Sequence, residues 1–223
     1  MIERIIESAI LNDFLRKKVI VLLGARQVGK TTLLESLRKK GQKVFSVNCD
    51  DMDDVLLIEE KTSTELRALL APYDLVFIDE AQRVKNIGLT LKKIGDLKLD
   101  TQVVVTGSSS LELADEVNEP ATGRLIEYRL FPFSLSELAT HTSEREEQRM
   151  LEQRLIYGLY PEVVTFPGDA KRTLMTLANN YLYKDLFSYR GLKKPDVLQK
   201  LLRTLALQLG NEVSYNELSN LLG

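Results

Sequence analysis

Eight consecutive residues carry the strongest chemical signal in the chain. Residues 24–31 read Gly-Ala-Arg-Gln-Val-Gly-Lys-Thr and match the phosphate-binding pattern G-x-x-x-x-G-K-[ST]. A polyphosphate needs many hydrogen-bond donors at short range, and the two glycines let the backbone wrap closely while successive N–H groups point inward. The positive end of a following helix adds to the attraction. The spacing therefore predicts a loop that binds a nucleoside triphosphate.

We expect distinct roles for the side chains of this loop. Lys30 should reach the β- and γ-phosphate oxygens, the Thr31 hydroxyl should ligate Mg²⁺, and Thr32 is placed for the α-phosphate. A glycine-containing strand-to-helix turn that matches by chance is the alternative, and the flanking strand and helix argue against it. Nucleotide contacts are expected along the whole loop, from Gly24, Ala25, Arg26, Gln27, Val28 and Gly29.

Two carboxylates follow a second apolar run. Residues 75–78 read Leu-Val-Phe-Ile and lead directly into Asp79 and Glu80. A nucleotide–Mg²⁺ site needs an acid at the carboxyl end of a strand beside the loop strand. Asp79 would hold the metal through a water, and Glu80 would orient and deprotonate the attacking water. The pair favours hydrolysis over phosphoryl transfer to a second substrate; a solvated acidic turn is the alternative.

One hydroxyl and two guanidinium groups are further candidates. Thr106 ends a fourth apolar run and would sense the γ-phosphate or position the water, whereas a serine N-cap for a helix near Leu111 is the alternative use of this segment. Arg124 would stabilise transition-state charge, from its own chain or from a neighbouring subunit, and Arg26 could do the same. A surface ion pair is the alternative for each arginine.

The elements that must position these groups alternate between strand and helix. This alternation predicts an α/β fold with a mostly parallel sheet covered by helices on both faces. An acidic stretch, residues 50–54, reads as a solvated loop, with a cation site as the alternative. The expected strands are 19–23, 43–47, 75–78, 102–105 and 125–130, and the expected helices are 2–16, 31–40, 63–71 and 87–94.

The chain changes character after residues 131–133, Phe-Pro-Phe. The later segments have helical periodicity, and none reads as a buried strand. We therefore expect a P-loop domain over residues 1–131 and a smaller all-helical domain over residues 132–223. The expected helices are 134–139, 144–157, 170–188 and 197–209.

Composition excludes several classes of function. Cys49 and His141 are the single cysteine and histidine, which excludes a disulfide framework, a Cys-rich zinc site and a His-cluster metal site. The net charge of −2 argues against a globally basic nucleic-acid binder. No apolar run approaches the roughly 18 residues of a membrane span, and no signal peptide is recognisable, so we expect a cytoplasmic protein.

Taken together, the motifs resemble the AAA+-like P-loop ATPases of bacteria and archaea that carry an uncharacterised C-terminal domain. The resemblance implies a sheet in which the sensor strand lies between the loop strand and the acid strand, followed by a helical lid. ATP and Mg²⁺ are the implied ligands, and the absence of an N-K-x-D tetrapeptide for guanine also favours ATP. The matching residues are 24–34, 77–83, 105–109, 123–124, 130–134 and 157–163.

The resemblance also implies a longer protein. Members usually run well past 223 residues, and residues 205–222 would begin a winged-helix-like unit whose recognition helix would follow Gly223. We therefore expect either a truncated member or a chain whose resemblance to the family fails at its end, and in both cases the nuclease-like domain suspected for the family is not expected in this sequence.

These inferences lead us to expect a Mg²⁺-dependent ATPase whose hydrolysis drives a movement between sheet domain and lid. The alternative is a nucleotide-gated module that hydrolyses ATP negligibly and holds DNA or a protein partner. A small-molecule kinase is disfavoured by the Asp79–Glu80 pair. The partner stays open, and a homo-oligomer is required if Arg124 acts from a neighbouring subunit.

Overall fold

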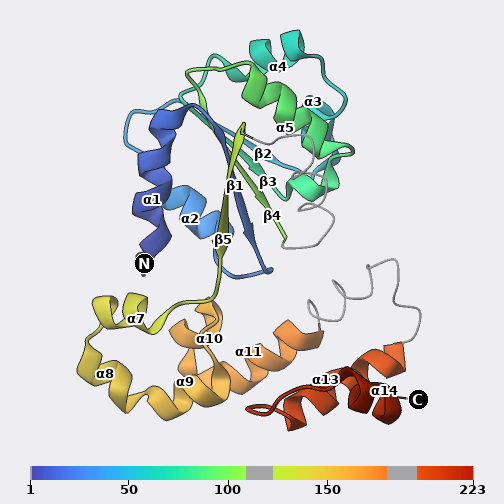
Figure 1. Ribbon diagram of the computed structural model, residues 1–223. Helices are drawn as coiled ribbons and strands as arrows, with labels where there is room; N and C mark the ends of the chain where they lie inside the picture. Colours follow the sequence, from blue (N-terminus) through green and yellow to red (C-terminus); the bar gives the residue numbers. More distant parts are fainter. Residues whose placement is uncertain (1, 109–122, 180–194, 223) are drawn as a thin grey trace. The chain divides into compact units, whose positions relative to one another are not determined.

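The computed structural model describes residues 2–108, 123–179 and 195–222 (Figure 1). By compactness the chain divides into two units, residues 1–170 and residues 171–223. The helix expected near Leu111 and part of the helix expected over residues 170–188 lie outside the described residues. The domain boundary expected at residues 131–132 stays a prediction.

The first unit is built on a parallel sheet, as the alternation of elements predicts. The order of its five strands is β2-β3-β4-β1-β5, so β4 lies between β1 and β3. This confirms the strand order that the family resemblance implies. The strands are β1 Val19–Gly24, β2 Val44–Asn48, β3 Leu75–Asp79, β4 Gln102–Gly107 and β5 Leu125–Leu130.

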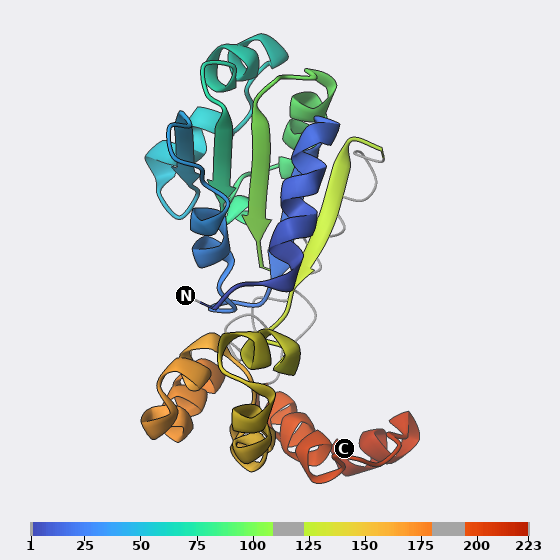
Figure 2. The same ribbon diagram turned by 90° about the vertical axis from the view of Figure 1, so that its left-hand side faces the viewer.

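Helices cover both faces of the sheet. Figures 1 and 2 show α1 and α2 along one face, and Figure 1 shows α3, α4 and α5 along the other. Short 3-10 turns follow α1 and β3. The bounds are α1 Ile5–Asp13, η1 Phe14–Arg16, α2 Lys30–Ser36, α3 Met52–Ile58, α4 Ser63–Leu70, η2 Ala81–Arg83 and α5 Ile87–Asp96.

The strand side chains alternate between two cores. On β1, Val19, Val21 and Leu23 belong to the core under α3, α4 and α5, whereas Ile20 and Leu22 belong to the core under α1 and α2. All six residues of β1 are buried, which explains why this strand appears in the sequence as an unbroken apolar run. Each such side chain contributes about 1.5–3 kcal/mol through burial.

Helix α3 includes residues 52–54 of the acidic stretch, so the expectation of a loop is wrong for these residues, whereas Asp50, Asp51 and Asp53 are exposed to solvent as expected. The Asp51 carboxylate caps the helix by accepting from Asp53 N at 3.0 Å. Asp53 and Asp54 lie in the first turn, where a negative charge interacts favourably with the helix N-terminus. Val55 and Ile58 then bury the apolar side of this helix.

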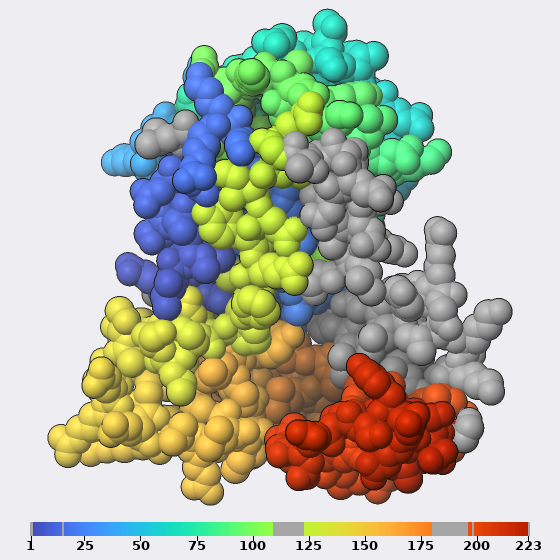
Figure 3. Space-filling view, in the orientation of Figure 1, coloured from blue at the N-terminus to red at the C-terminus, as the bar shows by residue number. Residues whose placement is uncertain are grey.

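Strand β5 and helix α1 lie side by side at one edge of the sheet, as the face drawn in Figure 3 shows. The Tyr128 hydroxyl on β5 donates to Asp13 Oδ2 at the end of α1, at 2.7 Å. Burial and this hydrogen bond raise the pKa of Tyr128 to about 12. The bond therefore fixes the outer strand to a helix that also covers β1.

Helices make up the described chain after β5. The helix expected over residues 144–157 is divided at Met150, and α10 has no counterpart among the predicted elements. None of the described helices combines the length and apolar composition that a membrane crossing requires. The bounds are α7 Leu135–His141, α8 Glu144–Arg149, α9 Leu151–Tyr157, α10 Pro161–Thr165, η3 Pro167–Asp169, α11 Ala170–Leu177, α13 Pro195–Leu207 and α14 Tyr215–Leu222.

A buried ion pair joins the start of α1 to α7. Arg4 Nε lies 3.1 Å from Glu137 Oε1, and the two side chains are 9% and 6% exposed. Glu137 Oε1 also accepts from Ile5 N at 2.9 Å, and Oε2 accepts from Ser134 N at 2.8 Å in a capping box. Burial by itself raises the pKa of Glu137, but the two N–H groups and Arg4 outweigh it and hold this pKa below its usual value.

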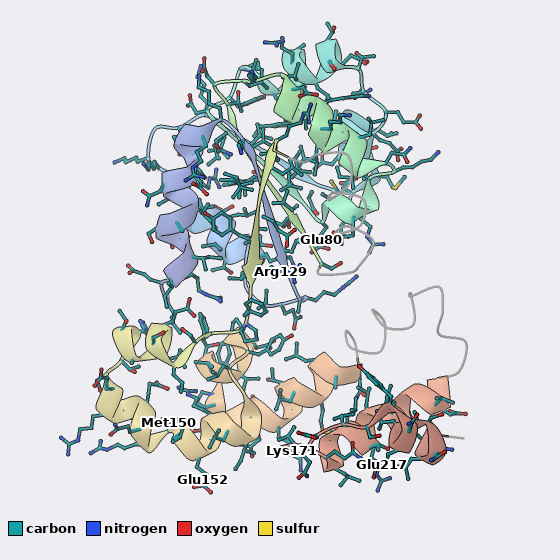
Figure 4. The ribbon with its side chains drawn as sticks, viewed as in Figure 1. Glu80, Arg129, Met150, Glu152, Lys171 and Glu217 are labelled. Carbon is teal, nitrogen blue, oxygen red and sulfur yellow. The ribbon has the colours of Figure 1, made fainter. Side chains whose placement is uncertain are left out.

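Glu137→Gln should flatten the loss of stability in acid. Because the pKa of Glu137 is lowered in the folded chain, its ionised form stabilises the fold above the usual pKa of 4.5, and this stabilisation is lost as the pH falls through the folded pKa. Thermal unfolding followed by circular dichroism should show a steeper fall of Tm for wild type than for the variant between about pH 5 and pH 3. Glu152→Gln, at an exposed carboxylate labelled in Figure 4, is the control. Parallel curves for wild type and Glu137→Gln contradict the prediction.

Gly24→Ala should destabilise the fold because β1 and β5 pack closely where they end. An added Cβ would lie 2.7 Å from Leu130 O and 2.9 Å from Val28 Cγ1. The Leu130 carbonyl belongs to the paired backbone, so we expect a cost of about 1–3 kcal/mol, measured as a lower urea midpoint. Gly168→Ala, where nothing lies within 4 Å of the added atom, is the matched control. Equal midpoints for the two variants would contradict the argument.

Candidate nucleotide-binding site

The loop of residues 24–31 joins buried β1 to α2, as the motif requires. Gln27 and Gly29 have positive φ angles of 57° and 98°, which turn the backbone sharply. Gly29 is the N-cap of α2, and its carbonyl accepts the first helical hydrogen bond from Leu33 N at 3.0 Å. The loop thus places a curved run of backbone directly before a helix N-terminus, which suits an anion.

Lys30 lies inside this curve and is only 5% exposed. Its Nζ donates to Gly24 O at 3.0 Å and to Ala25 O at 3.1 Å. The same atom lies 3.9 Å from Glu80 Oε1. The expected phosphate ligand and the expected general base therefore face each other, one from α2 and one from the end of β3.

Asp79 connects three elements through one carboxylate. Its Oδ2 accepts from Thr31 Oγ1 on α2 at 2.9 Å. Its Oδ1 accepts from the Thr106 hydroxyl on β4 and from Glu80 N, the latter at 3.1 Å. The structure thus brings together the two residues expected to hold a metal, Thr31 and Asp79, and adds Thr106 as a second hydrogen-bond partner of the same carboxylate.

Glu80 has an unusual backbone conformation. Its φ and ψ are 54° and 39°, in the left-handed region that costs a non-glycine residue about 1–3 kcal/mol. Its N–H donates to Asp79 Oδ1 and also lies 3.2 Å from Thr106 Oγ1. The side chain is 20% exposed and lies at the lower end of the sheet as drawn in Figure 4. This turn directs the carboxylate toward the loop rather than along the strand.

Gln82 contacts the site, although no argument from the sequence singles it out. Its Nε2 donates to Glu80 Oε2 at 2.5 Å, and its Oε1 accepts from Ser108 N at 3.3 Å. One amide therefore links the carboxylate of Glu80 to the end of β4. The signals in the sequence are its place two residues after Glu80, within a turn, and its position in the matching segment 77–83, which assigns it no role.

The electrostatic potential around Cys49, near the carboxyl ends of the strands, is negative. Cys49 is buried after β2, and its N–H donates to Asp79 O at 2.9 Å. Burial first, and then the negative charges of Asp54, Asp79, Asp50 and Glu80, raise the pKa of the Cys49 thiol to about 12. A cation placed among these carboxylates would be stabilised by the same field.

Arg124 is not brought to the loop of its own chain. It precedes β5, whose first residue Leu125 pairs with Val19 at the start of β1, whereas the loop follows the end of β1. The length of β1 therefore separates them, roughly 17 Å along a six-residue strand. Arg124 forms an ion pair with Asp96 on α5. A role within its own site is not supported, and a role from a neighbouring subunit stays a prediction.

The remaining loop residues occupy the positions that the motif gives them. Arg26 is half-buried within the loop, and Thr32 is exposed on the first turn of α2. Ser109, next to the end of β4, lies outside the described residues.

Two segments far away in the sequence border the loop. Arg4, before α1, donates from Nη1 to Val28 O at 3.2 Å. Pro161, the first residue of α10, has its Cγ 3.9 Å from the position of a Cβ added at Gly29. Phe133 N donates to Leu159 O at 2.9 Å, which joins the exit of β5 to the segment before α10. Sequence periodicity could not reveal these contacts, because they depend on tertiary structure.

Comparison with known proteins agrees with this geometry. Residues 16–139, more than half of the chain, match the family model of an AAA domain, and residues 148–223 match the model of a domain of unknown function. A Walker-type ATPase of Pyrococcus abyssi has a similar fold, with a TM-score of 0.56 at 18% identity over 100% of this chain and 88% of that chain.

Relatives of this chain occur in bacteria and archaea. An uncharacterized protein of Haemophilus influenzae is 25% identical over 94% of this chain and 55% of its own length. An uncharacterized protein of Methanocaldococcus jannaschii is 25% identical over 92% of this chain and 50% of its own length. The chain thus spans about half the length of these relatives. With a matched phosphate loop, an adjacent acid and the corresponding strand order, the chain belongs to the AAA domain family of P-loop ATPases.

Proposed function

We propose that the chain binds ATP together with Mg²⁺ and hydrolyses the γ-phosphate. The main observation behind this proposal is that Lys30, Thr31, Asp79 and Glu80 come together at the carboxyl ends of the strands. Lys30 and Glu80 face each other at 3.9 Å, and Thr31 and Asp79 share a hydrogen bond of 2.9 Å. These distances support the proposal, because they would bring a phosphate ligand, a metal ligand and a base within reach of one bound triphosphate.

The donor set suits a phosphate–magnesium complex. The loop N–H groups and Lys30 are donors for phosphate oxygens. Thr31 and Asp79 offer a hydroxyl and a carboxylate, the hard oxygen ligands that Mg²⁺ prefers, and proteins usually bind this ion through one or two such groups together with phosphates and water. When bound, the ion neutralises charge that develops on the transferred phosphoryl group. We propose that Thr31 and Asp79 hold it.

The roles of the remaining groups follow from their partners. Glu80 would accept the proton of the attacking water, since its carboxylate lies at the loop and is partly exposed. Thr106 is fully buried and donates to Asp79, so we assign it the task of orienting that carboxylate rather than contacting the γ-phosphate. Gln82 would fix the orientation of Glu80.

One observation favours the second candidate, a nucleotide-gated module with slow hydrolysis. The Glu80 carboxylate accepts from Gln82 and lies near Lys30, so protein groups already engage it on both oxygens. A base held in this way would turn over slowly until a partner altered the end of β4. A protein or DNA partner, a homo-oligomer and a cytoplasmic location all remain predictions.

Lys30→Ala and Glu80→Gln should separate binding from hydrolysis. Lys30→Ala removes a charge-assisted contact to phosphate, so we expect ATP affinity to fall about 10- to 100-fold in calorimetry. Glu80→Gln keeps the shape of the side chain but removes the base, so ATP should still bind while phosphate release falls about 100-fold or more. Lys85→Ala, at an exposed lysine, is the matched control for the lost charge.

The same assay distinguishes the two candidates. A rate for wild type that exceeds the rate for Glu80→Gln only after DNA or a protein partner is added supports the gated module. Normal turnover by Glu80→Gln would show that the base is misassigned, although nucleotide binding would stand.

ATP with Mg²⁺ should stabilise the fold. Ligand that binds the folded state alone contributes about 2.7 kcal/mol at a hundred times Kd, or roughly 5–10 °C for a chain of this size. Scanning calorimetry at millimolar ATP, with and without Mg²⁺, measures this shift, and Lys30→Ala is the control. An unchanged Tm at millimolar ATP–Mg²⁺ would count against the whole assignment.

A further inference from the structure

The guanidinium of Arg4 connects three separate parts of the first unit. Its Nη1 donates to Val28 O at 3.2 Å, its Nη2 donates to Phe131 O, and its Nε donates to Glu137 Oε1 at 3.1 Å. Its carbon Cζ also lies 4.7 Å from the centre of the Phe133 ring. The side chain is 9% exposed, so these contacts are made with little competition from water.

The contact with Val28 fixes one peptide group of the phosphate loop. The described peptide bonds are trans, so the C=O of residue 28 and the N–H of residue 29 lie in one plane and point in opposite directions. Because Arg4 binds the carbonyl, the N–H of Gly29 faces away from Arg4. A Cβ added at Gly29 would lie 3.7 Å from Arg4 Nη1, which places the guanidinium directly beside this peptide.

The orientation of this peptide matters for an anion. A carbonyl turned toward the phosphates would repel their oxygens, whereas an N–H turned toward them donates a hydrogen bond. A glycine peptide can rotate more freely than others, so the loop needs an outside contact to hold the favourable orientation. A positive charge on the carbonyl oxygen also polarises the peptide and strengthens its N–H as a donor.

Glu137 holds Arg4 in this position. Its Oε1 accepts from Arg4 Nε and from Ile5 N, while Oε2 accepts from Ser134 N. The carboxylate is thus fixed by backbone groups at the start of α1 and just before α7, and the guanidinium that it binds has little freedom to move. A buried charge pair with all these partners is well oriented, which a positioning role requires.

We propose that Arg4 is a positioning residue of the phosphate loop. It holds the peptide between Val28 and Gly29 so that the Gly29 N–H is available to a phosphate oxygen, and Glu137 holds Arg4. This inference rests on the proposed function, because it assumes that the loop binds phosphate. The competing interpretation is an anchor that contributes stability alone, through the ion pair with Glu137.

Two variants separate positioning from stability. Arg4→Lys keeps the positive charge, but an ammonium cannot match the planar fork that reaches Val28, Phe131 and Glu137 together. Glu147→Gln weakens a different buried ion pair, between Glu147 Oε2 on α8 and Arg154 Nε on α9 at 3.0 Å, and leaves the contacts of Arg4 in place. Both variants should lower Tm. Only Arg4→Lys should also weaken binding, by about tenfold, for ATP–Mg²⁺ and for inorganic tripolyphosphate alike.

Calorimetric Kd values and Tm values for the two full-length variants test the inference. Glu147→Gln should stay within about twofold of the wild-type Kd for both ligands. Wild-type affinity in Arg4→Lys, or equal losses of affinity in both variants at equal losses of Tm, overturns the positioning role. Weaker binding of ATP with unchanged binding of tripolyphosphate also overturns it, because the effect would then lie outside the phosphate loop.

The outcome for Lys30→Ala keeps this inference distinct from the proposed function. If Lys30→Ala loses ATP while Arg4→Lys binds it normally, the proposed function stands and the inference fails. If wild type binds neither ATP nor tripolyphosphate, both fail.

Discussion

The parallel register of three neighbouring strands is the constraint on which the site depends. Leu22 on β1 pairs with Thr106 on β4, and Ile78 on β3 pairs with Val105. Because all three strands run in the same direction, their carboxyl ends meet at one edge, as in other open parallel sheets. Asp79 therefore accepts from Thr31 and Thr106, although 48 and 27 positions separate these residues along the chain. A shift of β4 by one residue would turn Thr106 to the other face and remove this partner.

The sequence is sufficient to predict the central strands, which are buried on both faces. Residues 19–23 and 75–78 are continuous apolar runs, and such runs have few alternatives to a central strand. The motif and the strand-end acids then give Lys30, Thr31, Asp79 and Glu80. The structure does not support a role for Arg124 in the site of its own chain. Arg124 precedes β5, and in a parallel sheet this position lies at the amino ends of the strands, whereas the loop lies at their carboxyl ends.

Other features depend on contacts that no local pattern encodes. Arg4 and Glu137 are 133 positions apart, and each looks like an ordinary surface residue in the sequence. Their burial follows from the exit path of β5, which sets α7 beside the start of α1. Likewise, Asp51 caps α3, but only Val55 and Ile58 of this helix are buried. With so few buried residues, the acidic segment has the pattern of a loop in the sequence.

Negative side chains outnumber positive ones among the groups named at the site, and this excess favours the binding of a nucleotide together with a cation. Lys30 lies near one carboxylate, while Asp79, Asp50 and Asp54 add negative charge on the same side of the sheet. A triphosphate alone would bring further negative charge toward these groups. The loop amides attract the phosphates and the carboxylates attract the cation, so each ligand reduces the electrostatic cost of the other.

The environment of Cys49 has a practical consequence. A buried thiol with a pKa of about 12 is almost entirely protonated near neutral pH, and thiols react with maleimides and disulfide reagents as thiolates. The chain holds no other cysteine. A cysteine introduced on an exposed helix would therefore be the preferred attachment point for a fluorophore or spin label, with the natural cysteine left in place.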